Sequence, residues 1–94
     1  MAYYPDPASS VETAVGGSSA VITFVLVVDN FYLFASNTDC WIAQSATPVA
    51  SAGAGSMYVP ANLQVVINGR VGNHIAVIQD AGAGKCSLTH AYAT

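Results

Sequence analysis

The chain has 94 residues, of which 53% are hydrophobic and only 7% are charged, and its net charge is −3. Two cations, Arg70 and Lys85, are too few to neutralise the phosphates of a nucleic acid, and the longest apolar run, residues 20–28, is far shorter than the roughly 20 residues of a membrane span. The high apolar content excludes a wholly disordered chain, and no basic segment precedes an apolar one as a secretory signal requires.

The first 18 residues predict an N-terminal arm that ends in a short first strand, Val11–Val15. Pro5 and Pro7 hold the backbone extended and remove hydrogen-bond donors. We therefore expect the arm to form neither a helix nor a central strand. Residues 19–94 are expected to form the folded domain.

The rest of the chain has an all-β pattern. Short runs rich in Val, Ile, Phe and Tyr are separated by Gly, Pro, Asn and Asp at intervals of roughly ten residues. The predicted strands are Ala20–Val28, Phe31–Ala35, Asp39–Gln44, Met57–Val59, Leu63–Ile67, His74–Gln79 and Cys86–Tyr92. Together they predict a small antiparallel β-sandwich, jelly-roll-like and of a single domain, with the extended N-terminal arm.

Four connections can be assigned from their residues. Asp29-Asn30 and Asn68-Gly69 tolerate positive φ between apolar runs, so each predicts a tight hairpin. The small residues of 45–56 predict a surface loop. Residues 80–84, DAGAG, predict another connection. The overlapping run 81–86 resembles a phosphate-binding loop only superficially, because Gln79 and Cys86 stand where that motif needs Gly and Ser or Thr.

Several positions are candidates for contact with another chain. In Ala20–Val28 both strand faces are apolar, and Val25 and Val27 lie on the second face, where a solvated strand would carry polar residues. Tyr3 and Tyr4 supply most of the apolar area of the arm, which contacts another chain or folds back onto its own sandwich. We expect the chain to associate with itself, as a trimer or a dimer.

The titratable residues predict no catalytic, metal-binding or cofactor-binding site. His74 and His90 fall in different predicted strands, and the spacings typical of zinc ligands do not occur. Cys40 and Cys86 are expected to be free thiols in a reducing cytoplasm, with a disulfide between them as the alternative. We therefore expect a protein that is not an enzyme.

The segment from Tyr32 to Thr89 resembles a group of small virion proteins from tailed bacteriophages and prophages. The residues that carry the resemblance are Phe34, Asp39–Ile42, Val59–Ala61, Gly69, Gly72, Ala76–Asp80 and Gly84–Thr89. The resemblance implies a β-sandwich or jelly-roll-like subunit on the phage particle, namely a capsid decoration (cement) protein that binds the major capsid protein. Such a subunit would be assembled in the host cytoplasm and located on the capsid surface.

Two alternatives to a decoration protein stay open. Trp41 and Tyr58 are aromatic residues of a kind that stack on sugars, which favours a receptor-binding or glycan-binding module of a spike or fibre. A head-to-tail or tail component could use the same sandwich. The number of copies per particle distinguishes these functions.

Overall fold

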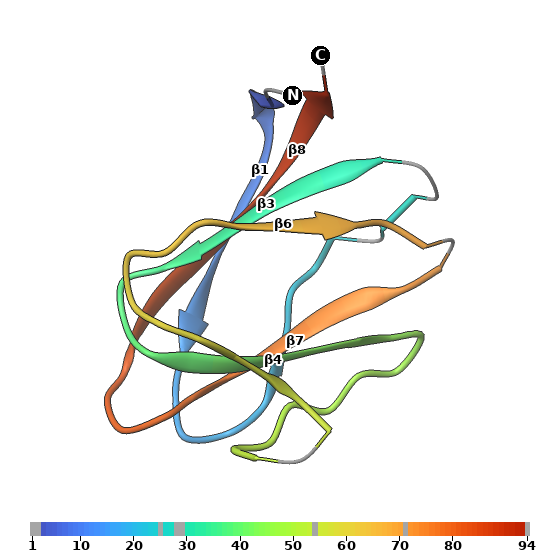
Figure 1. The fold of residues 1–94 in the computed structure, drawn as a ribbon. Helices are drawn as coiled ribbons and strands as arrows, with labels where there is room; N and C mark the ends of the chain where they lie inside the picture. Colours follow the sequence, from blue (N-terminus) through green and yellow to red (C-terminus); the bar gives the residue numbers. More distant parts are fainter. Residues whose placement is uncertain (1–2, 25, 28–29, 54, 71, 94) are drawn as a thin grey trace.

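The computed structural model describes residues 3–24, 26–27, 30–53, 55–70 and 72–93. They form two antiparallel sheets of four strands each, which pack against each other as two layers (Figure 1). Every regular secondary-structure element among the described residues is a β-strand. The all-β sandwich predicted from the sequence is therefore confirmed.

Strands from both ends of the chain meet in the first sheet. Its order is β1 (Tyr3–Val15), β8 (Gly84–Ala93), β3 (Phe31–Ser36), β6 (Val65–Asn68). The second sheet has the order β2 (Ala20–Val21), β7 (His74–Gln79), β4 (Cys40–Ser45), β5 (Met57–Val59). The bounds of β5 and β7 are as predicted. The strands β3, β4, β6 and β8 begin or end one or two residues away from their predicted bounds.

The core lies between the two sheets. Phe34 and Leu88 from the first sheet and Val77 from the second are each fully buried. Every second residue of a strand faces the same side, so the alternating apolar residues of both sheets meet in the middle. Burial of each large side chain stabilises the fold by about 1.5–3 kcal/mol, which makes this layer the main source of stability.

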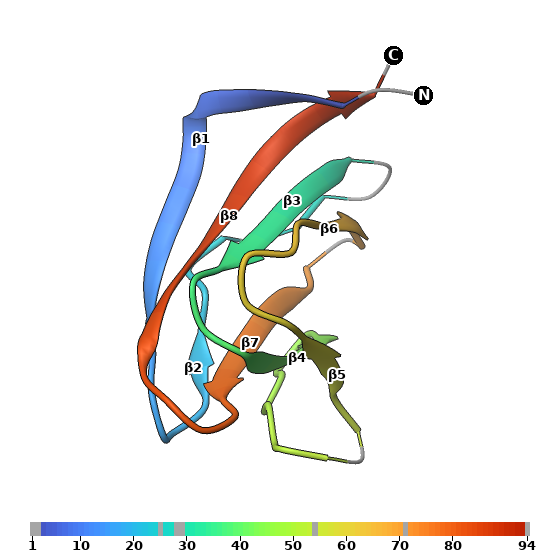
Figure 2. The same ribbon diagram turned by 60° about the vertical axis from the view of Figure 1, so that its left-hand side comes forward.

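The predicted arm belongs to an edge strand. The backbone of Tyr3–Pro5 pairs with Ala91–Ala93 of β8, and the register shifts between Pro5 and Ser10. Figure 2 shows these two strand ends side by side, with both termini at that end of the molecule. Proline is tolerated there because an edge strand leaves half of its donors unpaired. The side chains of Tyr3 and Tyr4 lie outside the described residues, so their contact with another chain stays a prediction.

The segment that was predicted as the strand Ala20–Val28 is a strand only at Ala20–Val21. Beyond it the backbone stays beside β7 through two hydrogen bonds, from Ile22 N to Ile75 O and from Leu26 N to Asn73 O, both 2.8 Å. Its side chains still alternate, because Ile22 and Leu26 are buried. The apolar pattern therefore predicted which residues face inward, although the ladder of hydrogen bonds is too sparse for a regular strand.

The second apolar face is covered in one place and open in another. In β7, Ala76 is fully buried, and Ile78 is partly buried opposite Trp41. In contrast, Val21 and Val27 keep 48% and 51% of their surface exposed. Val25 lies outside the described residues.

The two predicted hairpins are wrong. The segment before Asp29-Asn30 lies beside β7, which belongs to the second sheet. The strand β3, which comes after Asp29-Asn30, belongs to the first sheet. Asn68-Gly69 likewise leads from β6 in the first sheet to β7 in the second. A Cβ atom on Gly69 would collide with the backbone carbonyl of Val27 and lie 2.9 Å from the ring of Tyr32. This glycine therefore allows two segments to approach closely, and it does not close a hairpin.

Candidate functional site

Apolar and aromatic side chains meet at the end of the sandwich where the chain termini lie. The rings of Tyr32 and His90 are 5.6 Å apart, and those of His90 and Tyr92 are 4.8 Å apart. The backbone N–H of Val27 donates to the Tyr32 hydroxyl group at 3.1 Å. Val27 and Tyr92 are 51% and 57% exposed. We call Val27, His90 and Tyr92 the terminal surface.

Of the residues of the terminal surface, Val27 alone was a contact candidate in the sequence analysis. Tyr92 is the register partner of Tyr4 in the β1–β8 ladder. Val27 joins it through the chain of rings that runs from Tyr32 to His90. The sequence analysis missed His90 and Tyr92 as contact residues. His90 and Tyr92 lie on the same face of β8 as the buried Leu88, because the three residues are spaced two apart. This alternation was the signal that could have identified them.

A second surface lies on the outer face of the second sheet. Trp41 of β4 is the direct register partner of Tyr58 of β5, and their ring centroids are 5.2 Å apart with the planes tilted by 60°. Both rings face outward, because the neighbours Cys40 and Ile42 are buried in the core. Tyr58 is 42% exposed.

Two carboxylates hold these rings in place. The indole N–H of Trp41 donates to Oδ1 of Asp80 at 2.9 Å. Asp39, which acts on the Tyr58 hydroxyl group, accepts the backbone N–H of Ala61 with its Oδ1 at 2.7 Å. Desolvation, followed by the negative charges of Asp39 and Asp80, raises the pKa of Tyr58. We call Trp41, Tyr58, Asp39 and Asp80 the aromatic patch.

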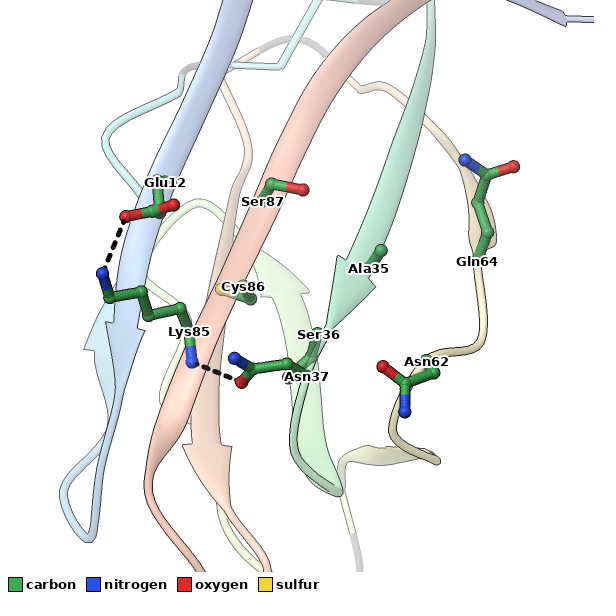
Figure 3. Close-up of a pocket in the computed structure, with 9 residues that line it drawn as sticks. All are labelled: Glu12, Ala35, Ser36, Asn37, Asn62, Gln64, Lys85, Cys86 and Ser87. Atoms are coloured by element: carbon green, nitrogen blue, oxygen red, sulfur yellow. Dashed lines mark hydrogen bonds and ion pairs between the residues drawn. The ribbon is translucent and has the colours of Figure 1, made fainter.

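A shallow groove of about 430 Å³ lies on the outer face of the first sheet (Figure 3). Polar side chains line it, namely Glu12, Asn37, Asn62, Gln64, Lys85 and Ser87. Lys85 Nζ is 3.5 Å from Glu12 Oε1, and both side chains are about two-thirds exposed, so this ion pair contributes at most about 1 kcal/mol. Oδ1 of Asn37 accepts the backbone N–H of Lys85 at 2.8 Å. The groove offers amide and hydroxyl groups for weak polar contacts.

The two cysteines are buried, free thiols. Cys86 is the register partner of Ser36, whose hydroxyl group donates to the backbone carbonyl of Thr38 at 2.8 Å. Burial raises the pKa of both thiols, and for Cys86 burial and the neighbouring Cys40 raise it to about 11. The thiolate is the reactive form, so neither cysteine is an activated nucleophile at neutral pH.

The histidines stand apart in the fold. His74 begins β7 in the second sheet, whereas His90 lies in β8 of the first. Within the part of the chain that the structure describes, no three His, Cys, Asp or Glu side chains gather in a way that could hold a metal ion. The same part contains no helix long and apolar enough to cross a membrane.

The terminal surface and the aromatic patch both present side chains suited to contact with another molecule. The first is mainly apolar, and the second combines aromatic rings with negative charge. Comparisons of the chain with protein-family models, with curated proteins and with solved structures found no significant match.

Proposed function

We propose that this chain is a structural virion protein, a capsid decoration (cement) protein that binds the major capsid protein and stabilises the phage head shell. The observation that carries the proposal is the exposed apolar surface of a protein with very few charges. The resemblance of residues 32–89 to small virion proteins supports the phage head as the place of binding.

The exposed apolar side chains are large and numerous for so small a protein. They are Val21, Val27, Val49, Met57, Tyr58, Leu63, Val66 and Tyr92, each between 41% and 74% exposed. Only 7% of residues are charged, whereas a soluble monomer usually covers about 25–35% of its surface with charged residues. Covering these side chains with another protein removes them from water, at about 25 cal/mol for each Å² of apolar area.

The terminal surface is the part of this exterior that we assign to docking. Val27 and Tyr92 are each more than half exposed, and the edge strand β1 pairs with β8 beside Tyr92. Contact through apolar groups needs no catalytic group and little charge. A homo-oligomer, a trimer or a dimer, brings several copies of the surface to one shell.

The proposal is tested on purified phage particles. The copy number of this protein is expected to scale with that of the major capsid protein. A small fixed number of copies would place the chain in a tail, a neck or a spike and would contradict the proposal.

A matched pair of variants tests the docking surface itself. Val27→Glu puts a charge on the terminal surface, and Val49→Glu puts the same charge on an exposed valine of the loop between β4 and β5. We expect Val27→Glu to abolish binding to particles that lack the protein and Val49→Glu to retain it. Equal binding by the two variants would exclude the terminal surface.

A further inference from the structure

The indole donor of the aromatic patch is already used. The indole N–H of Trp41 donates to Oδ1 of Asp80 at 2.9 Å, and Asp39 lies beside Trp41 and Tyr58, immediately before the start of β4. The groups left for another molecule are the ring faces and the free lone pairs of the two carboxylates. A carboxylate has about four such lone-pair sites, and Asp80 accepts one hydrogen bond from Trp41 while Asp39 accepts one from Ala61. The patch therefore recognises a donor.

The patch is also negatively charged without compensation. Neither Asp39 nor Asp80 pairs with a cationic side chain among the described residues. Lys85 lies instead beside Glu12 on the first sheet. The faces of aromatic rings are themselves electron-rich, so the rings and the carboxylates both attract a positively charged ligand.

Among cations, a guanidinium group fits this arrangement best. It is planar, it stacks on aromatic rings, and it carries five donors and no acceptor. An ammonium group is compact and strongly hydrated, and it gains less from a ring face. A neutral sugar can also donate to the carboxylates, but it carries no positive charge to compensate Asp39 and Asp80.

We propose that the aromatic patch binds an arginine side chain of a partner protein, with the guanidinium group stacked on the exposed ring of Tyr58 and donating to Asp80 and Asp39. This inference rests on the proposed function, since it gives the docking protein a second and charge-specific contact. The apolar terminal surface would supply contact area, and the patch would select where on the partner the protein binds.

The chain carries its own reporter for this contact. Trp41 is the one tryptophan of the sequence, so its fluorescence and its indole N–H resonance report on the patch directly. The probe is the peptide acetyl-Gly-Arg-Gly-amide, titrated into the isolated protein. The control peptides carry lysine or citrulline in place of arginine, and citrulline keeps the shape of the side chain without its charge. We expect a saturable shift of the indole resonance with arginine, a weaker one with lysine and none with citrulline.

Two variants matched in charge sharpen the test. Asp80→Asn removes one negative charge from the patch but keeps an oxygen that accepts the indole N–H. Glu12→Gln removes one negative charge from the opposite sheet. We expect Asp80→Asn to weaken binding of the arginine peptide roughly tenfold, and Glu12→Gln to leave it unchanged.

Three results would overturn the assignment. They are an equal shift with the citrulline peptide, equal weakening by the two variants, and a shift of Trp41 with cellohexaose or chitohexaose but not with arginine. The last result would make the patch a sugar-binding surface. The titration needs no phage particle, so its failure leaves the proposed function standing, and a protein that binds the peptide but not particles contradicts the proposed function alone.

Discussion

Gly69 lies where the end of β6 passes the segment before β3, and its missing side chain lets the two backbones approach. Its N–H donates to the carbonyl of Asn30 at 2.8 Å, and a Cβ atom would overlap the carbonyl of Val27. The neighbour that would have to move is backbone, which cannot turn aside as a flexible side chain can. The position therefore depends on glycine for space.

Replacing Gly69 by alanine is expected to lower the free energy of unfolding by about 1–3 kcal/mol, because the backbone must shift to make room. Gly16→Ala is the matched control, since a Cβ atom there meets nothing within 4 Å. It should change the free energy of unfolding by less than about 1 kcal/mol. Urea unfolding of both variants measures the difference, and equal stabilities would contradict the close approach.

The burial of Cys86 predicts how stability changes at alkaline pH. Its pKa is raised from 9.0 to about 11 in the folded protein, so between these values the folded state binds more protons than the unfolded state. The contribution of this thiol is fully present below pH 9 and is lost as the pH rises towards about 11. Two pKa units set an upper bound of about 3 kcal/mol, and residual access of water reduces it.

Urea unfolding below pH 9 and near pH 11 tests this dependence, with Cys86→Ala as the comparison. The variant lacks the thiol and is expected to lose less stability over that interval than the wild-type protein. Cys40, whose pKa is also raised by burial, contributes in the same direction to both proteins. An identical alkaline loss in the two proteins would show that the Cys86 thiol does not titrate differently on folding.

At the scale of the elements, alternation of apolar residues was the most informative pattern. It predicted β5 and β7 with their observed bounds, and in residues 22–26 it predicted the inward side chains even though the strand ends at Val21. Packing against the core needs only the side chains in the right places. A regular ladder needs in addition an uninterrupted partner, and this segment has only widely spaced hydrogen bonds to β7.

The connections were harder to predict, for a physical reason. Asn68-Gly69 indicates a reversal of the chain, but nothing local specifies whether the next strand joins the same sheet or the other one.

The aromatic patch could be predicted from the sequence only in part, for the same reason. The sequence showed Trp41 and Tyr58 as candidates, whereas the contact with Asp80 joins residues 39 positions apart and depends on the register of the second sheet.

Adjacent residues of the segment before β3 provide a test of its side-chain pattern. Leu26 is 1% exposed and Val27 is 51% exposed. Leu26→Ala should therefore lower the free energy of unfolding by about 2–4 kcal/mol, because it leaves a cavity in the core. Val27→Ala should change it by less than about 0.5 kcal/mol. Thermal or urea unfolding decides, and comparable losses in the two variants would mean that the segment is not anchored as the structure shows.

At the scale of the whole molecule, the protein combines a well-buried core with an exterior that is poor in charge. The exposed valines outside the terminal surface, Val21, Val49 and Val66, add apolar area that a free monomer would leave in water. Closed symmetry hides such area without building filaments, which is why we expect a trimer or a dimer. A contact made by apolar groups is not screened by salt, in contrast to ion pairs.

Sedimentation of the purified protein at low micromolar concentration and high salt tests the central claim, that the apolar exterior binds other chains. We expect a discrete oligomer of the 9.6 kDa chain whose mass does not fall as salt is raised. A compact and soluble wild-type monomer under these conditions would contradict the claim, because the exposed valines and aromatic rings would then be tolerated in water.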